Sequence, residues 1–167
     1  MAKKRKLVPF WHPSLYRKAK KATPSEQTKE LIKEMKRVAE EDKGVGLAAP
    51  QVGVSQRVIV VADGDRGYKA LLNPEIKKKS QETVKVKEGC LSLSGVWCEK
   101  ERARKVLAVA ENEEGVRLEI EAEDMLAVVL QHEIDHLEGH LFISEFGFFT
   151  KVKLIFQHVF QKQEQPD

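Results

Sequence analysis

Cysteine is scarce in this sequence: 167 residues contain two, too few for the disulfide framework that stabilises many small secreted proteins. Also absent is any uninterrupted apolar run of about 18 residues, the length that a membrane-spanning helix requires. The basic start MAKKRKLVPFWHPS has no apolar core of a signal peptide, because Pro9, His12 and Pro13 interrupt it. We therefore expect a protein of a reducing compartment, the cytoplasm, without contact to a membrane.

A strong charge of one sign is missing as well. The 29 Lys and Arg residues nearly balance the 26 Asp and Glu residues, which leaves a formal net charge of +3. So mild a charge gives no reason to expect direct DNA binding, and we interpret the basic run at residues 3–6 as a solvated terminus. The length, the 41% hydrophobic content and the lack of repeats or linkers predict one domain over residues 1–167.

Strands are predicted between two helices. Apolar residues at helical spacing predict helices over about 25–42, capped by Thr23 or Ser25, and over 122–138, where Gly139 ends the helix. A last amphipathic segment has its apolar positions between residues 149 and 159. Between the helices, β-branched or alternating patterns predict an antiparallel meander of strands over residues 57–62, 68–76, 83–91, 105–112 and 116–123.

The second predicted helix contains the sequence HEIDH at residues 132–136. His132 and His136 are one turn apart on one face, so both imidazoles can bind one metal ion. Glu133 is rotated from that face by about 100°, so its carboxylate can reach a water molecule beside the ion without occupying a coordination position. The motif is specific and indicates a hydrolytic metal site. The alternative is two structurally hydrogen-bonded histidines and a solvated glutamate.

A catalytic metal of this kind needs a third protein ligand. The extended protease motif would supply a histidine where this sequence has Phe142. His140 follows the glycine that ends the helix, so its imidazole is poorly aimed. Cys90 is the better candidate, because Gly89 permits close backbone approach and a metal would hold the sulfur as thiolate. Taken alone, Cys90 also fits a buried structural cysteine.

Three stretches, GVGLAAPQVG, EGCLS and QHEIDHLEG, resemble the signature motifs of the peptide deformylase family, in the family's order and with similar separations. The similarity continues through HPSLYRKAK, RVIVV, LLNPEI and HLFI, and covers most of the chain to about residue 145. It implies an α+β fold with antiparallel β-sheets wrapped around a central metal-binding HExxH helix. It also implies a metal-dependent hydrolase that removes the formyl group from the N-terminal methionine of new polypeptides and releases formate.

Carried over by position, the resemblance implies that Cys90, His132 and His136 bind the metal and that Glu133 is the general acid and base. Gln51 and the backbone N–H of Leu91 would then donate hydrogen bonds to the developing oxyanion.

The implied substrate contacts are Gly44, Val45, Gly46, Gly89, Leu91, Val128 and Val129. Gly44 and Gly46 let an extended peptide lie against the loop, or they merely form a turn. A phosphate-binding loop is a weak alternative, because no Lys-Ser/Thr pair follows the glycines. The valines line a methionine pocket by resemblance, or they are plain core residues.

The resemblance implies one divalent metal ion, Fe²⁺ in the cell, with Zn²⁺, Ni²⁺ or Co²⁺ possible in the purified protein. The implied partners are N-formyl-Met nascent peptides and, through a C-terminal helix containing Lys151 and Lys153, the ribosome. An ordinary packed helix explains that segment as well. The sequence departs from the family where Ser94 replaces a usual proline, and Trp97 occupies a position that varies within the family.

Two other functions match parts of the pattern. A zinc endopeptidase would use HEIDH in another way, but Phe142 stands where its third ligand would be. A non-enzymatic binding module with a structural metal would need four protein ligands, and the sequence offers no convincing fourth.

Overall fold

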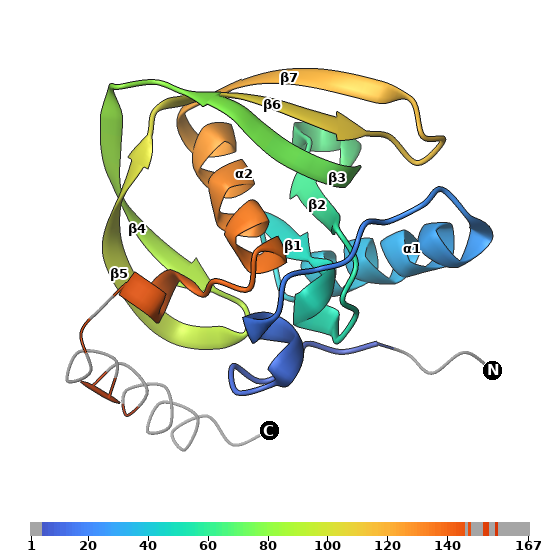
Figure 1. Ribbon diagram of the computed structural model, residues 1–167. Helices are drawn as coiled ribbons and strands as arrows, with labels where there is room; N and C mark the ends of the chain where they lie inside the picture. Colours follow the sequence, from blue (N-terminus) through green and yellow to red (C-terminus); the bar gives the residue numbers. More distant parts are fainter. Residues whose placement is uncertain (1–4, 146, 148–151, 154–155, 157–167) are drawn as a thin grey trace.

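The computed structural model describes residues 5–145, 147, 152–153 and 156 (Figure 1). Its helices are α1 (Glu26–Glu41) and α2 (Asp124–Leu137). Its strands are β1 (Gly46–Ala48), β2 (Val58–Ala62), β3 (Tyr68–Lys79), β4 (Thr83–Cys90), β5 (Leu93–Ala103), β6 (Lys105–Glu111) and β7 (Arg117–Glu123). The predicted α+β class is confirmed, and so are both predicted helices, to within about two residues at each end.

Helix α1 follows directly from its sequence. The Ser25 side chain accepts a hydrogen bond from the Thr28 backbone N–H at 3.2 Å, which makes Ser25 rather than Thr23 the cap. Buried apolar residues recur along one face and pack in a core cluster with β1 and β2: Leu31, Ile32, Met35, Val38 and Ala39. This face fixes the start of the glycine-rich segment that follows the helix.

Two antiparallel sheets enclose α2, as the resemblance implies (Figure 1). The larger sheet has the strand order β1-β2-β3-β6-β7, and β4 pairs with β5 in a separate ribbon. Helix α2 lies between the ribbon and the larger sheet. The predicted meander is therefore interrupted: β3 pairs with β6, because β4 and β5 leave the larger sheet together.

Strand β5 was not predicted from the sequence, because charged residues occupy both of its faces. Lys100 and Arg102 alternate with Glu99 and Glu101, so charged residues occupy both faces of the strand. Lys100 and Arg102 are nonetheless buried, facing Asp135 on α2 at 3.9 and 2.7 Å. A pattern of apolar and polar alternation cannot reveal a strand whose inward side chains are cations with buried partners.

Helix α2 is buried on most of its surface. Ala127, Leu130 and Leu137 belong to the main core cluster, and Gln131 exchanges hydrogen bonds with both backbone groups of Ala103. Gly139, at a φ of 80°, ends the helix as predicted. The side chains of this central helix are thus held in place from several sides.

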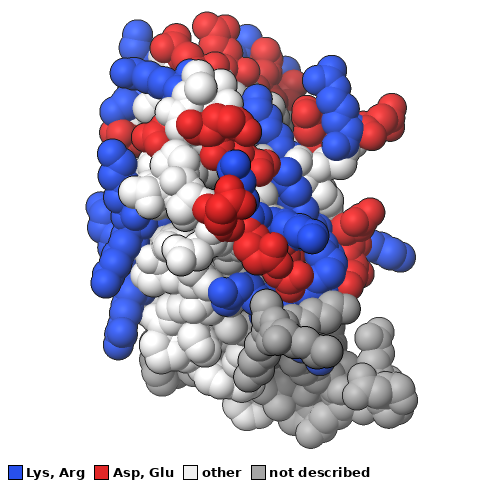
Figure 2. Space-filling model, turned by 90° about the vertical axis from the view of Figure 1, so that its right-hand side faces the viewer, with Lys and Arg blue, Asp and Glu red and all other residues white. Residues whose placement is uncertain are grey.

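The surface matches the mild net charge. On the face shown in Figure 2, acidic and basic side chains are interspersed over the upper part, basic ones line the left edge, and uncharged residues lie below. No helix among the described residues has both the length and the apolar character needed to cross a bilayer. The predicted segment over 149–159 lies mostly outside the described residues, and the single-domain assignment stays a prediction.

Candidate active site

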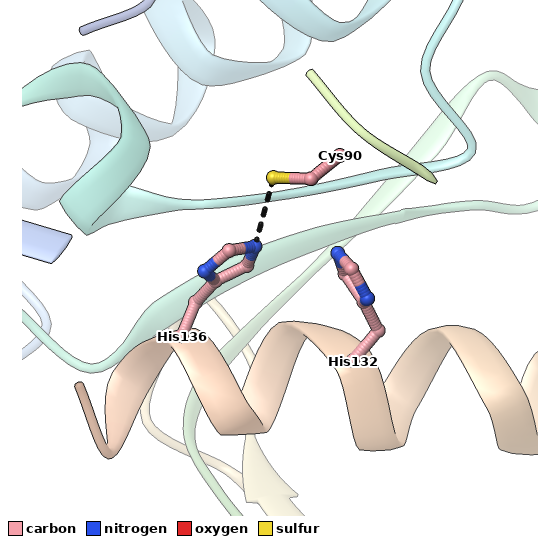
Figure 3. Close-up of side chains that lie close together, drawn as sticks. All are labelled: Cys90, His132 and His136. Carbon is pink, nitrogen blue, oxygen red and sulfur yellow. Dashed lines mark hydrogen bonds between the residues drawn. The ribbon is translucent and has the colours of Figure 1, made fainter. Parts of the chain in front are cut away.

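The structure brings together the three residues that the sequence proposes as metal ligands. Cys90 ends β4, and His132 and His136 lie one turn apart on α2, with their ligand atoms within 4.8 Å of one another. The Cys90 Sγ is 3.4 Å from the His136 Nε2, and both imidazoles rise from the same side of the helix (Figure 3). His140 is exposed beyond Gly139 and is not part of this group.

The chemistry of these donors fits one divalent metal ion. A cysteine sulfur and two imidazoles suit Zn²⁺, Fe²⁺, Ni²⁺ and Co²⁺. Burial lowers the pKa of His136 well below its usual value, which keeps the imidazole neutral and able to act as a ligand. Burial also opposes charge on His132, but hydrogen bonds with Cys90 and Glu88 outweigh it and raise the pKa of His132 to about 10. The same negative surroundings that favour a proton on His132 also favour a positively charged metal ion beside its ring.

A buried ionic network orients His132. The Glu88 Oε2 lies 2.9 Å from the His132 Nδ1, which leaves the other ring nitrogen to face Cys90. Arg102 donates two hydrogen bonds to the Glu88 carboxylate, at 2.5 and 2.9 Å, and a third to Asp135 at 2.7 Å. Burial raises the pKa of Glu88, but the bonds from Arg102 and His132 outweigh it and bring the pKa to about 2. Glu88 therefore remains a carboxylate.

Glu133 is buried beside the histidines. Its Oε2 accepts no hydrogen bond from any described residue, and burial raises its pKa to about 7. A carboxyl group with such a pKa can both accept and return a proton near neutral pH. The Glu133 Oε1 lies close to Gly46, where a Cβ would be only 2.6 Å away. The glycine therefore provides the space that Glu133 occupies.

Gln51 lies in the short 3-10 helix Ala49–Val52 and is buried. Its Oε1 accepts a hydrogen bond from the Ala48 backbone N–H at 2.7 Å. The amide NH₂ must then point the other way, and it lies 3.4 Å from the Cys90 Sγ. This bond to the backbone fixes Gln51 as a donor toward the site.

A cleft of about 420 Å³ opens beside these residues. Gln51, Cys90, His132 and Glu133 all line it. The other predicted contact residues line it too: Gly44, Val45, Gly46, Gly89, Leu91, Val128 and Val129. Val45 is 57% exposed, so it lies at the rim rather than in the wall.

Sequence reasoning missed Glu88, Arg102 and Asp135. A signal for Glu88 was present, because it precedes Cys90 by two positions on a predicted strand and so shares its face. Arg102 gave no such signal, since its strand was not predicted. Asp135 lies inside the HEIDH motif, but only the fold shows that Arg102 reaches it.

Known proteins share much of this sequence. The sequence profile of the family described as polypeptide deformylase matches residues 4–151. A peptide deformylase of Natranaerobius thermophilus is 47% identical over 133 residues, which is 79% of this chain and 85% of that protein. One of Fusobacterium nucleatum is 43% identical over 121 residues, 72% of this chain and 70% of that protein.

Solved structures extend the similarity to the whole fold. The crystal structure of a peptide deformylase from Legionella pneumophila superposes with a TM-score of 0.89 at 34% identity, covering 97% of this chain and 99% of that one. That of Thermus thermophilus gives 0.82 at 36% identity, covering 95% and 98%. With the profile matched across most of the sequence and the fold shared almost end to end, the chain belongs to the peptide deformylase family.

Proposed function

We propose that the protein hydrolyses the formyl group from N-formyl-Met nascent peptides, with Cys90, His132 and His136 holding one divalent metal ion. Membership of a family of metal-dependent hydrolases supports the reaction class. The observation that carries the assignment is the convergence of these three donors beside a cleft that Cys90, His132 and Glu133 line, where the Glu133 Oε2 accepts no hydrogen bond from the described residues. Fe²⁺ is the ion that we propose for the cell.

A divalent ion held by Cys90, His132 and His136 would act as a Lewis acid, which would polarise a carbonyl group and make water a better nucleophile. The protein then has to stabilise the charge that grows on the carbonyl oxygen. The Gln51 amide, held by Ala48, supplies one donor, and we assign the second to the Leu91 backbone N–H. The Gln51 amide is fixed before the reaction, so little reorganisation of this donor is needed.

Glu133 is the general base and general acid in this mechanism. Its carboxylate accepts a proton from the attacking water and returns it to the methionine nitrogen as the carbon–nitrogen bond breaks. Water thus adds across that bond, and the products are formate and a free amine. The buried position and raised pKa of Glu133 support both steps.

Two sheet edges support binding of an extended peptide. Gly44 and Gly46 line the cleft on the β1 side, and Gly89 lines it on the β4 side. Neither β1 nor β4 has a strand partner on its second edge among the described residues. A peptide strand can pair there while the methionine side chain points toward Val128 and Val129. We place this reaction in the cytoplasm, where new chains leave the ribosome, and a direct ribosome contact stays a proposal.

Three peptides test the function in one incubation: formyl-Met, acetyl-Met and an unmodified longer peptide. The formyl carbon bears only hydrogen, and an acetyl methyl has to fit against the walls beside Cys90. A steric clash that removes even a few kcal/mol of transition-state stabilisation slows hydrolysis of the acetyl peptide about a hundredfold or more. We expect rapid formate release from the first peptide and intact internal bonds in the third, measured by mass spectrometry. Internal cleavage with formyl-Met untouched would identify an endopeptidase.

A further inference from the structure

Trp97 has a large exposed side chain beside the cleft. The proposed mechanism does not use this side chain. It is 66% exposed and lines the cleft from β5. The strand register pairs Trp97 with Gly89, and Glu99 with Lys87. Residues paired across an antiparallel ribbon share a face, so these four residues lie on one side of it.

That side faces away from α2. The alternating residues Glu88 and Cys90 face the helix, since they contact His132 and His136. The ribbon therefore has an inner face, which contains Glu88 and Cys90. Its opposite face, here called the outer face, contains Lys87, Gly89, Trp97 and Glu99.

The indole of Trp97 is held against the backbone beside Cys90. A Cβ built on Gly89 would lie 3.0, 3.1 and 3.2 Å from three carbons of the indole, tighter than an ordinary contact. The ring thus occupies the space that a side chain at position 89 would need. Its other surface faces solvent, so a flat apolar wall stands next to the edge on which a substrate strand would lie.

The geometry points to Trp97 as a specificity residue for the second residue of the substrate, and this inference rests on the proposed function. Side chains of an extended peptide alternate between two sides. When the methionine points to Val128 and Val129, the next side chain turns to the outer face and meets the indole. Trp97 then favours an aromatic second residue.

Nearby charges disfavour a cationic second residue in the substrate. Lys43 and Lys87 line the same cleft as Trp97, whereas Glu99, the acidic residue of the outer face, does not. The acidic residues that do line the cleft, Glu88 and Glu133, are buried on its inner side. An Arg or Lys in the substrate would gain a cation–π contact with Trp97 but would be repelled by these lysines. An acidic second residue would be attracted by them, yet it would cover little of the ring. The outer face therefore distinguishes aromatic from cationic side chains.

The test compares kcat/KM for formyl-Met-X-Ser peptides with Gly, Phe, Lys or Glu as X. We expect Phe to exceed Gly by about tenfold, and Lys to fall below Phe. Trp97→Ala should reduce the Phe to Gly ratio to below about threefold, mainly through KM, and Trp97→Phe should retain part of it. Trp11→Ala is the matched control, since Trp11 is 63% exposed but does not line the cleft.

An unchanged ratio in Trp97→Ala, or an equal loss in Trp11→Ala, would overturn the inference. So would a preference for Glu over Phe, which would assign the selection to the lysines. If all four formyl peptides react equally well, the inference fails and the proposed function stands. If none of them releases formate, the proposed function itself fails.

Discussion

Replacing one carboxylate oxygen of Glu133 by an amide nitrogen tests its proposed role in catalysis separately from metal binding. We expect Glu133→Gln to keep its metal, because Cys90, His132 and His136 are unchanged, and to lose about 10²–10⁴ in turnover. An amide of the same shape cannot accept the proton of the attacking water. Formate release and elemental analysis on the same preparation measure the two properties. Near-normal turnover with metal present would remove Glu133 from the mechanism.

The Glu88 carboxylate orients His132, one of the three proposed metal ligands. It bonds the His132 Nδ1 at 2.9 Å and is fixed by two bonds from Arg102. Groups that orient a metal-binding histidine typically contribute a factor of about 10–100 in metal affinity. We therefore expect Glu88→Gln to weaken metal binding by that factor in competition with a chelator.

Glu99→Gln is the matched control for Glu88, because Glu99 is exposed on the neighbouring strand and faces away from α2. Equal affinities in the two variants would mean that His132 is oriented without Glu88. Circular dichroism of both variants shows whether loss of the buried ion pair with Arg102 has unfolded the chain, since breaking such a pair costs about 3–5 kcal/mol.

At the level of elements, sequence periodicity predicted what depends on apolar side chains. Helix α1 has its cap at Ser25 and its apolar face as expected, and strands β2, β3, β4, β6 and β7 lie close to their predicted ranges. Strand β5 remained hidden, because its inward residues Lys100 and Arg102 are charged. The glycine-rich motif likewise gave no sign that Gly46 begins the short strand β1.

The site was predictable to the extent that local motifs determine it. HEIDH needs only the helical period to place His132 and His136 together, Cys90 was the better third candidate from its own surroundings and from the resemblance, and Gln51 came from the resemblance alone. The orientation of Gln51 depends on the Ala48 N–H, and that of His132 on Arg102 from another strand. The first contact depends on the local turn, and the second joins separate strands, so neither leaves a pattern in a single sequence.

Strand β1 packs so closely against α2 at Gly46 that a larger residue there should disturb Glu133. Gly46 does not have a positive φ, so alanine is acceptable to its backbone, but a Cβ there would lie 2.6 Å from the Glu133 Oε1 and 2.9 Å from the Val129 Cγ1. Overpacking of this kind costs about 1–3 kcal/mol. We expect Gly46→Ala to displace Glu133 and lower kcat about tenfold or more, while the fold persists.

Gly147→Ala is the control for Gly46, because no described atom lies within 4 Å of its added methyl group. Thermal melting and kcat are measured for both variants. If Gly46→Ala matches the control in kcat, then Glu133 tolerates displacement and the close approach of β1 has no catalytic consequence.

At the scale of the whole molecule, the three proposed metal ligands come from two parts of the fold that share no sheet. Cys90 belongs to the β4–β5 ribbon, whereas the two histidines belong to α2, which packs against the larger sheet. An ion held by all three ties the ribbon to the helix. Binding to the folded chain alone stabilises that chain by RT ln(1 + [L]/Kd).

The last prediction follows from this link. At a free metal concentration about 1,000 times Kd, the gain is about 4 kcal/mol, which for a chain of this length raises Tm by roughly 8–16 °C. Nickel or zinc added to chelator-treated protein should produce this shift in the native sequence and in Cys98→Ala, whose half-buried thiol lies outside the ligand group. Cys90→Ala should lose most of the shift, because two imidazoles alone hold the ion far less tightly. A full shift in Cys90→Ala, or its loss in Cys98→Ala, would mean that the ion binds elsewhere and that β4 is not held to α2 through Cys90.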